Sequence, residues 1–83
     1  MKECEIEEKR SFKRSLKKLP EDIKERIAEA IDIIKENPFS GRPLKGRLKK
    51  LWRYRVGKFR IVYLPYPCRV LLITIGHRET VYS

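Results

Sequence analysis

The chain has 83 residues, enough for one small domain with one core and one surface site. This length excludes a separate cofactor-binding domain, and no apolar run approaches the roughly 20 residues of a membrane-spanning helix. The first residues, MKECEIEEKR, are polar and acidic and do not resemble a signal peptide. We therefore expect a single domain over residues 1–83 that uses no cofactor or metal and is located in the cytoplasm.

The net charge of +10 is concentrated in the second half of the sequence. Residues 1–40 contain ten Lys or Arg and ten Asp or Glu, which cancel. Residues 41–83 contain eleven Lys or Arg against a single acid, Glu79. Solubility alone would spread charge over the whole surface. A one-sided positive field predicts a polyanionic partner, above all nucleic acid, because Lys and Arg bind its phosphates.

The two cysteines, Cys4 and Cys68, are far apart in the sequence and have too few histidines nearby for a metal site. Two interpretations stay open, namely a pair of free thiols or a disulfide. The composition favours a thermophilic source, since Lys, Glu, Arg and Ile are abundant, Gln is absent and Asn occurs once. Disulfides do occur inside the cells of hyperthermophiles.

The first forty residues predict a short strand followed by two helices. Residues 2–7 favour a strand, and residues 9–19 favour a helix because Phe12, Leu16 and Leu19 follow helical spacing. Pro20 ends that helix and suits the first turn of the next. The second helix should end at Asn37, because a proline follows. Its apolar residues form one stripe, comprising Ile23, Ile27, Ala30, Ile31 and Ile34.

A loop rich in Gly, Pro and basic residues spans positions 39–50, and the hydrophobic period then changes to two. The run LWRYRVGKFRIVYL predicts a hairpin that turns at Gly57 and Lys58. One face of this hairpin is aromatic and carries Trp52, Tyr54, Val56, Phe59, Ile61 and Tyr63. The other, which we call the arginine face, carries Arg53, Arg55, Arg60, Val62 and Leu64.

The run RVLLITIG predicts a last strand that is buried on both faces. The order of elements is then β-α-α-β-β-β, an α+β fold with a helical hairpin packed on a mostly antiparallel, twisted sheet. We expect the helices to cover the aromatic face and to bury Trp52, Tyr54, Phe59, Ile61, Ile27 and Ile31.

The arginine face is a candidate anion-binding site. The hairpin places Arg55 directly opposite Arg60, and like charges in that position destabilise a sheet. No acid occurs in these two strands to neutralise them. A solvated strand face is the alternative, but arginine is suited to bidentate contacts with phosphate. Further basic residues around the hairpin are candidates for RNA contacts, namely Arg47, Lys49, Lys50 and Lys58.

Three residues after the last strand add candidate chemistry. His77 is expected beside the arginines, where a nearby cation favours the neutral imidazole that exchanges protons near neutral pH. Arg78 follows it, and Tyr82 offers a ring for stacking and a hydroxyl for hydrogen bonding. A structural histidine and a tyrosine at the edge of the core remain as alternatives.

The loop NPFSGRPLKGRLKKL, the hairpin WRYRVGKFRIVY, the apolar strand and the closing IGHRETVY together resemble the RelE/ParE superfamily of toxins from toxin–antitoxin systems. The RelE branch, including its archaeal members, is the most similar. The resemblance covers most of the chain and implies a β-α-α-β-β-β fold like that of microbial ribonucleases. It further implies cleavage of messenger RNA in the ribosomal A site of the small subunit. Neutralisation by an acidic or amphipathic, RelB-like antitoxin is also implied.

The resemblance assigns functional positions to Arg53 and Arg55 on the second strand, Arg60 on the third, Arg78 after the last and Tyr82 near the end. Two departures from the bacterial RelE pattern stand out. The basic pair is lysine there, and lysine can act as a proton acceptor whereas arginine cannot. The spacing between the last two positions is also shorter here. The pattern therefore favours charge stabilisation over general-base chemistry.

Ribonucleolysis requires removal of the 2′-OH proton, stabilisation of the phosphorane and protonation of the 5′-oxygen. The arginine face suits the second task, while His77 or Tyr82 is a candidate for the first. Arg78 is a candidate for positioning the phosphate or neutralising the leaving oxygen. Two other functions stay open, namely a ParE-type toxin that binds DNA gyrase and an inactive, RNA-binding relative.

Overall fold

The computed structural model describes residues 5–44, 50–67 and 69–77. The elements in chain order are β1 (Glu5–Glu8), α1 (Arg10–Lys17), α2 (Glu21–Glu36), β2 (Arg42–Pro43), β3 (Trp52–Val56), β4 (Phe59–Tyr66) and β5 (Arg69–His77). No helix within the described ranges is long and apolar enough to cross a membrane.

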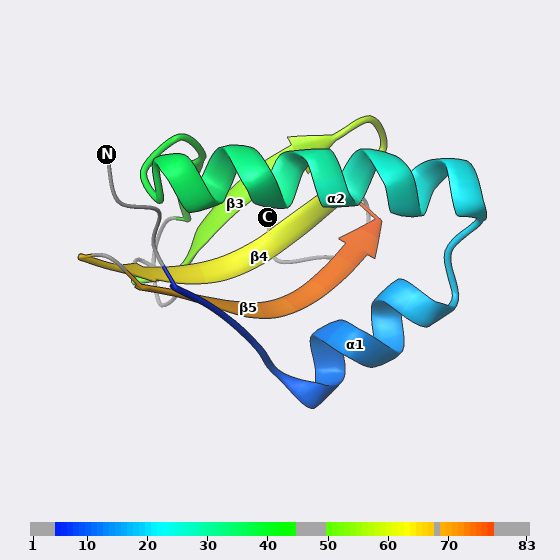
Figure 1. Ribbon diagram of the computed structural model, residues 1–83, viewed down its shortest axis with the longest axis horizontal. Coiled ribbons are helices and arrows are strands. Elements are labelled where there is room, and N and C mark those ends of the chain that lie inside the picture. The colour runs from blue at the N-terminus through cyan, green and yellow to red at the C-terminus, as the bar shows by residue number, and fades with distance from the viewer. Residues whose placement is uncertain (1–4, 45–49, 68, 78–83) are drawn as a thin grey trace.

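The strands form one five-stranded sheet in the order β1-β5-β4-β3-β2. β1 runs parallel to β5, and every other neighbouring pair is antiparallel. Figure 1 shows the twisted sheet, with α2 crossing one of its faces and α1 lying near the C-terminal end of β5. The predicted α+β architecture is therefore confirmed, with two helices on a mostly antiparallel sheet.

The second helix begins and ends where its sequence signals place it. Pro20 is the N-cap in an extended conformation, and Glu21 and Asp22 bring negative charge to the first turn. Asn37 is the C-cap and is also extended. The apolar stripe packs against the sheet, with Ile27 and Ile34 fully buried. Tertiary burial of one helical face thus fixes α2 over the aromatic face of the hairpin.

The first helix protects the edge of β5. β1 pairs with β5 only as far as Leu72, and α1 then continues alongside the exposed edge. The Lys9 amide donates to the Leu72 carbonyl at 2.9 Å, and the Ser11 hydroxyl donates to the Ile73 carbonyl. A helix over this edge satisfies strand groups that would otherwise be open to pairing with another chain.

The hairpin has the predicted register, with Arg55 opposite Arg60 and Val56 opposite Phe59. Gly57 in the turn has a φ of 61°, a conformation that glycine adopts without strain. Ile61 and Tyr63 of the aromatic face are fully buried, and Val56 is almost fully buried. The other predicted residues of that face, Trp52, Tyr54 and Phe59, are partly buried and pack on the same core, as does Ile31 of α2.

Two features of the sheet differ from the sequence expectation. The segment predicted as a loop contains the short strand β2, which pairs with the start of β3. In β5 the register shifts between Val62 and Tyr63 of its neighbour, so that the strand does not alternate regularly. Val70, Leu72 and Ile75 of β5 are buried, whereas the residues between them are half-buried. Burial on both faces of this strand is therefore only partial.

Candidate active site on the arginine face

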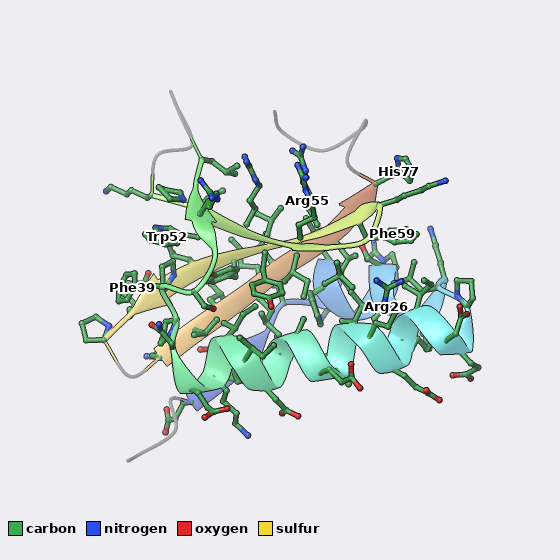
Figure 2. All side chains as sticks on the ribbon, turned by 90° about the horizontal axis from the view of Figure 1, so that it is seen from above. Arg26, Phe39, Trp52, Arg55, Phe59 and His77 are labelled. Atoms are coloured by element: carbon green, nitrogen blue, oxygen red, sulfur yellow. The ribbon has the colours of Figure 1, made fainter. Side chains whose placement is uncertain are left out.

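The arginine face lies on the side of the sheet that the helices leave uncovered. Residues directly opposite one another in neighbouring strands share a face, and Arg55 is opposite Arg60 while Arg53 is opposite Val62. Figure 2 shows Arg55 projecting from the sheet on the side away from α2. The structure therefore brings Arg53, Arg55 and Arg60 together on one surface.

The three arginines differ in their exposure. Arg55 is exposed and Arg53 is half-buried, but Arg60 is only 8 % exposed. Arg60 is therefore largely removed from solvent, although it lies on the same face as Arg53 and Arg55. Arg60 lies on β4, the central strand of the sheet, so neighbouring strands flank it on both sides. Val62 on the same face is fully buried, so the arginine face has an apolar centre.

Among the described residues, no acidic side chain forms an ion pair with Arg53 or Arg55. The ion pairs among the described residues join Lys24 to Glu21 and Arg69 to Glu7, and neither involves Arg53 or Arg55. Arginine is effectively always charged, so these positions hold fixed positive charge at the surface. Such an arrangement is unfavourable for folding but favours an anionic ligand.

His77 lies at the end of β5, where it is opposite Phe59. The two rings meet edge to face, with centroids 5.8 Å apart and planes at 80° (Figure 2). The position opposite Arg60 belongs instead to Gly76. The residue expected beside the arginines thus packs against the ring of Phe59, one position along β5 from Gly76, which is opposite Arg60.

The remaining predicted site residues fall into two groups. Lys50, which precedes β3, and Lys58, in the hairpin turn, are both exposed. The second group lies outside the described residues and comprises Arg47, Lys49, Arg78 and Tyr82. Cys4 and Cys68 also lie outside them.

A pocket beside the arginine face was not anticipated from the sequence. It has a volume of about 420 Å³ and is lined by Ser40, Gly41, Arg42, Arg53, Tyr54 and Arg55. Arg42 belongs to β2, is exposed and lies directly opposite Arg53. The arginine face therefore includes Arg42. The signal for β2 was weak, because its two residues include a proline, which sheets tolerate mainly at their edges.

Tyr63 fixes the segment that forms one wall of this pocket. Its side chain is fully buried, and its hydroxyl donates to the Pro38 carbonyl at 2.8 Å. The same oxygen accepts from the Gly41 amide at 3.2 Å. Burial raises the pKa of Tyr63 to about 12, with the Gly41 hydrogen bond opposing the increase and the charge of Tyr54 adding to it. The hydroxyl thus stays protonated and keeps donating at neutral pH.

Position 41, just before β2, has no room for a side chain and therefore requires glycine. A Cβ at this position would collide with the carbonyl oxygen of Arg53 and with the hydroxyl of Tyr63. The close approach lets the segment before β2 lie against β3, which places Arg42 beside Arg53. Chemically, the site offers several fixed positive charges around a concave surface, suited to binding phosphate and to stabilising negative charge that develops on it.

Comparison with known protein families shows the family to which the chain belongs. Residues 6–82 match the family described as ParE toxin of type II toxin–antitoxin system, parDE. The chain belongs to this ParE toxin family. It is accordingly a toxin of a type II toxin–antitoxin system. No curated protein matches the sequence.

Solved structures of RelE toxins share the fold. The RelBE2 toxin–antitoxin complex from Mycobacterium tuberculosis has 24% identity and a TM-score of 0.84, with 94% of each chain covered. The archaeal RelE–RelB complex from Pyrococcus horikoshii has 19% identity and a TM-score of 0.76, covering 96% of this chain and 100% of that one. The isolated E. coli RelE toxin has 16% identity and a TM-score of 0.77, with 89% and 83% covered. The family profile thus carries the ParE name, and these structural neighbours are RelE toxins.

Proposed function

We propose that this toxin is a ribosome-dependent endoribonuclease that cleaves messenger RNA in the A site and thereby stops translation. The observation that carries the proposal is the group of arginines on the sheet face opposite the helices, with no acidic partner for Arg53 and Arg55 among the described residues. A surface used only for protein binding would not require such dense positive charge. Phosphate groups, and the extra negative charge of a phosphorane, match it.

In this mechanism the arginines stabilise charge and do not move protons. Arg55 is exposed and Arg53 half-buried, so both are placed to contact non-bridging phosphate oxygens at or next to the scissile linkage. Arg60 is nearly buried on the same face, so it supplies a fixed positive charge beneath the bound phosphate. Arginine does not serve as a general base near neutral pH, so the 2′-OH proton passes to another group. His77 and Tyr82 are the candidates in this chain, and Arg78 is the candidate for the leaving oxygen.

Dependence on the ribosome would explain how the toxin acts when the described residues around Arg53 and Arg55 include no strong base. Cleavage without one requires that the 2′-oxygen already be aligned with the phosphorus. A ribosome that holds the mRNA in a fixed conformation supplies that alignment. The toxin then adds charge stabilisation to a substrate that is already oriented.

An antitoxin is the expected protein partner. Structural neighbours of this chain were solved as complexes of RelE with RelB. We propose a RelB-like antitoxin with an acidic segment that covers the arginine face and neutralises it. Its affinity should fall with added salt, because the contacts are largely electrostatic.

Binding of DNA gyrase without RNA cleavage is the second candidate, and the ParE family match favours it. Primer extension on translated mRNA after toxin expression separates the two. Cleavage within codons on translating ribosomes is expected for the first function. Inhibition of gyrase supercoiling with intact mRNA is expected for the second.

A paired substitution ties the activity to the arginine face. R53Q/R55Q removes two charges, and we expect a loss of cleavage of at least 10²-fold, the usual effect of losing one such stabilising contact. R10Q/R14Q is the matched control, because it removes two exposed arginines from α1. If both double variants cleave like the unmodified toxin, the arginine face is not the active site.

A further inference from the structure

Arg42 is placed for a role that the proposed catalytic arginines do not account for. It lies at the edge of the sheet, opposite Arg53, and lines the pocket of about 420 Å³ together with Ser40 and Gly41. It is exposed, and no ion pair with a described residue neutralises it. A second pair of like charges on one surface costs stability, so it suggests a second anion site.

The arginine face contains two such pairs in a regular arrangement. Arg55 and Arg60 face each other across β3 and β4, and Arg42 and Arg53 face each other across β2 and β3. The pairs are offset by two residues along β3, which corresponds to about 6.6 Å on the same face of a strand. The pair centres also lie one strand spacing apart, about 4.8 Å, so they are roughly 8 Å from each other, a separation that long arginine side chains can adapt to consecutive phosphates.

The second pair sits on a rigid support. The segment that leads into Arg42 is held by the buried hydroxyl of Tyr63, which bonds to both Pro38 and Gly41. Gly41 in turn packs against the Arg53 carbonyl too closely for any side chain. The backbones of Arg42 and Arg53 are therefore fixed relative to each other, so less entropy is lost when both bind one anion.

We propose that Arg42, with Arg53 and the Ser40 hydroxyl, binds a second RNA phosphate, the one adjacent to the phosphate held by Arg55 and Arg60. The proposal rests on the function proposed above and names a subsite of the same face. Arginine pairs at a repeated spacing fit the repeating charge of a phosphodiester chain better than the irregular carboxylates of a protein. The subsite would hold the neighbouring nucleotide and keep the scissile linkage in register.

The test measures binding, so that it does not depend on turnover. Programmed ribosomes carry an mRNA with a 2′-deoxy residue at the scissile position, which prevents cleavage, and labelled toxin is titrated onto them. R42Q is expected to bind about 10- to 100-fold more weakly, the range for losing a hydrogen bond to a charged group. R14Q, which removes an exposed arginine of α1, should bind like the unmodified toxin.

A chemical change in the RNA locates the contact. A neutral methylphosphonate is placed at the linkage next to the scissile one, in either direction. At one of these linkages it should weaken binding of the unmodified toxin and have no additional effect on R42Q. If R42Q responds to each methylphosphonate as the unmodified toxin does, the subsite is disproved.

Two further outcomes are distinguishable. If R42Q binds the programmed ribosomes normally but binds a purified antitoxin more weakly, the pocket belongs to the protein partner and the proposal fails. If the unmodified toxin does not bind the programmed ribosomes at all, the proposed function itself fails. Circular dichroism of R42Q serves as the folding control.

Discussion

The two faces of the β3–β4 hairpin are built on opposite principles. On the helix side, Trp52 is opposite Tyr63, and aromatic pairs of this kind contribute about 0.2–1 kcal/mol to a sheet in addition to their burial. On the arginine face, the same two strands place Arg55 opposite Arg60, a pair that costs stability. The pair on the helix side stabilises the fold, whereas the like-charge pair on the arginine face reduces its stability.

The difference indicates what each face is for. The helix side packs against α2 and the shared hydrophobic core, so its binding partners lie within the chain. On the arginine face, Arg53 and Arg55 have no acidic partner among the described residues, so we expect a ligand to supply their counter-charge. Substitutions on the first face should therefore act through stability, and those on the second should reduce activity without unfolding the protein.

The largest effect on stability is expected at Ile61, which is fully buried under the helices. I61A should lower the free energy of unfolding by about 2–5 kcal/mol, because it removes apolar contacts and leaves a cavity. Urea denaturation followed by circular dichroism measures this change. I33A is the matched control, since Ile33 on α2 is 44 % exposed and its truncation should cost far less. Equal losses for the two variants would contradict the assigned faces.

Much of this architecture could be predicted from the sequence. The hairpin has an apolar face with a period of two, and the second helix has an apolar stripe of isoleucines that could pack against it. A one-residue slip would have exchanged the two faces, so the register followed once the aromatic side was assigned to the core. The turn at Gly57 fixed which residues are opposite each other. Arg55 and Arg60 could therefore be paired before any coordinates were known.

The remaining features depend on contacts that no local pattern encodes. The burial of Arg60, like that of Val62 on the same face, depends on tertiary packing that sequence alternation does not reveal. The pairing of β2 is too short to give a period, and the link from Tyr63 to Gly41 spans 22 positions. Arg42 was consequently assigned to a loop, and its approach to Arg53 was missed.

A smaller loss is expected when the hydroxyl of Tyr63 is removed. Y63F leaves the Pro38 carbonyl and the Gly41 amide without their partner, which should cost about 1–3 kcal/mol of unfolding free energy. Y66F is the matched control, because Tyr66 is 46 % exposed and loses no described hydrogen bond. If Y63F is as stable as Y66F, the hydroxyl does not hold the pocket wall.

The same residue predicts an alkaline pH dependence. The folded pKa of Tyr63 is about 12, above its ordinary value of 10.0, so the folded state retains the proton longer than the unfolded state. This stabilisation is fully present below pH 10 and is lost as the pH rises towards about 12. Two pKa units correspond to about 2–3 kcal/mol. The difference in unfolding free energy between the unmodified protein and Y63F should shrink over this range, whereas a constant difference would contradict the raised pKa.

The smallest expected effect has the opposite sign. R55Q keeps the length and polarity of the side chain but removes its charge from the position opposite Arg60. We expect the unfolding free energy to rise by a few tenths of a kcal/mol up to about 1, because the like-charge pair is relieved. Cleavage should fall at the same time, because Arg55 is one of the proposed phosphate contacts.

A control must show that the rise in unfolding free energy of R55Q comes from relief of the Arg55–Arg60 pair and not from the lower net charge. R14Q removes one positive charge from the last turn of α1, where a cation is favourable, so it should leave stability unchanged or slightly lower. The gain in R55Q should also shrink in high salt, which screens the exposed partner of the pair. A loss of stability in R55Q at low salt would mean that Arg55 supports the fold. The contrast between a folding face and a ligand-binding face would then not hold.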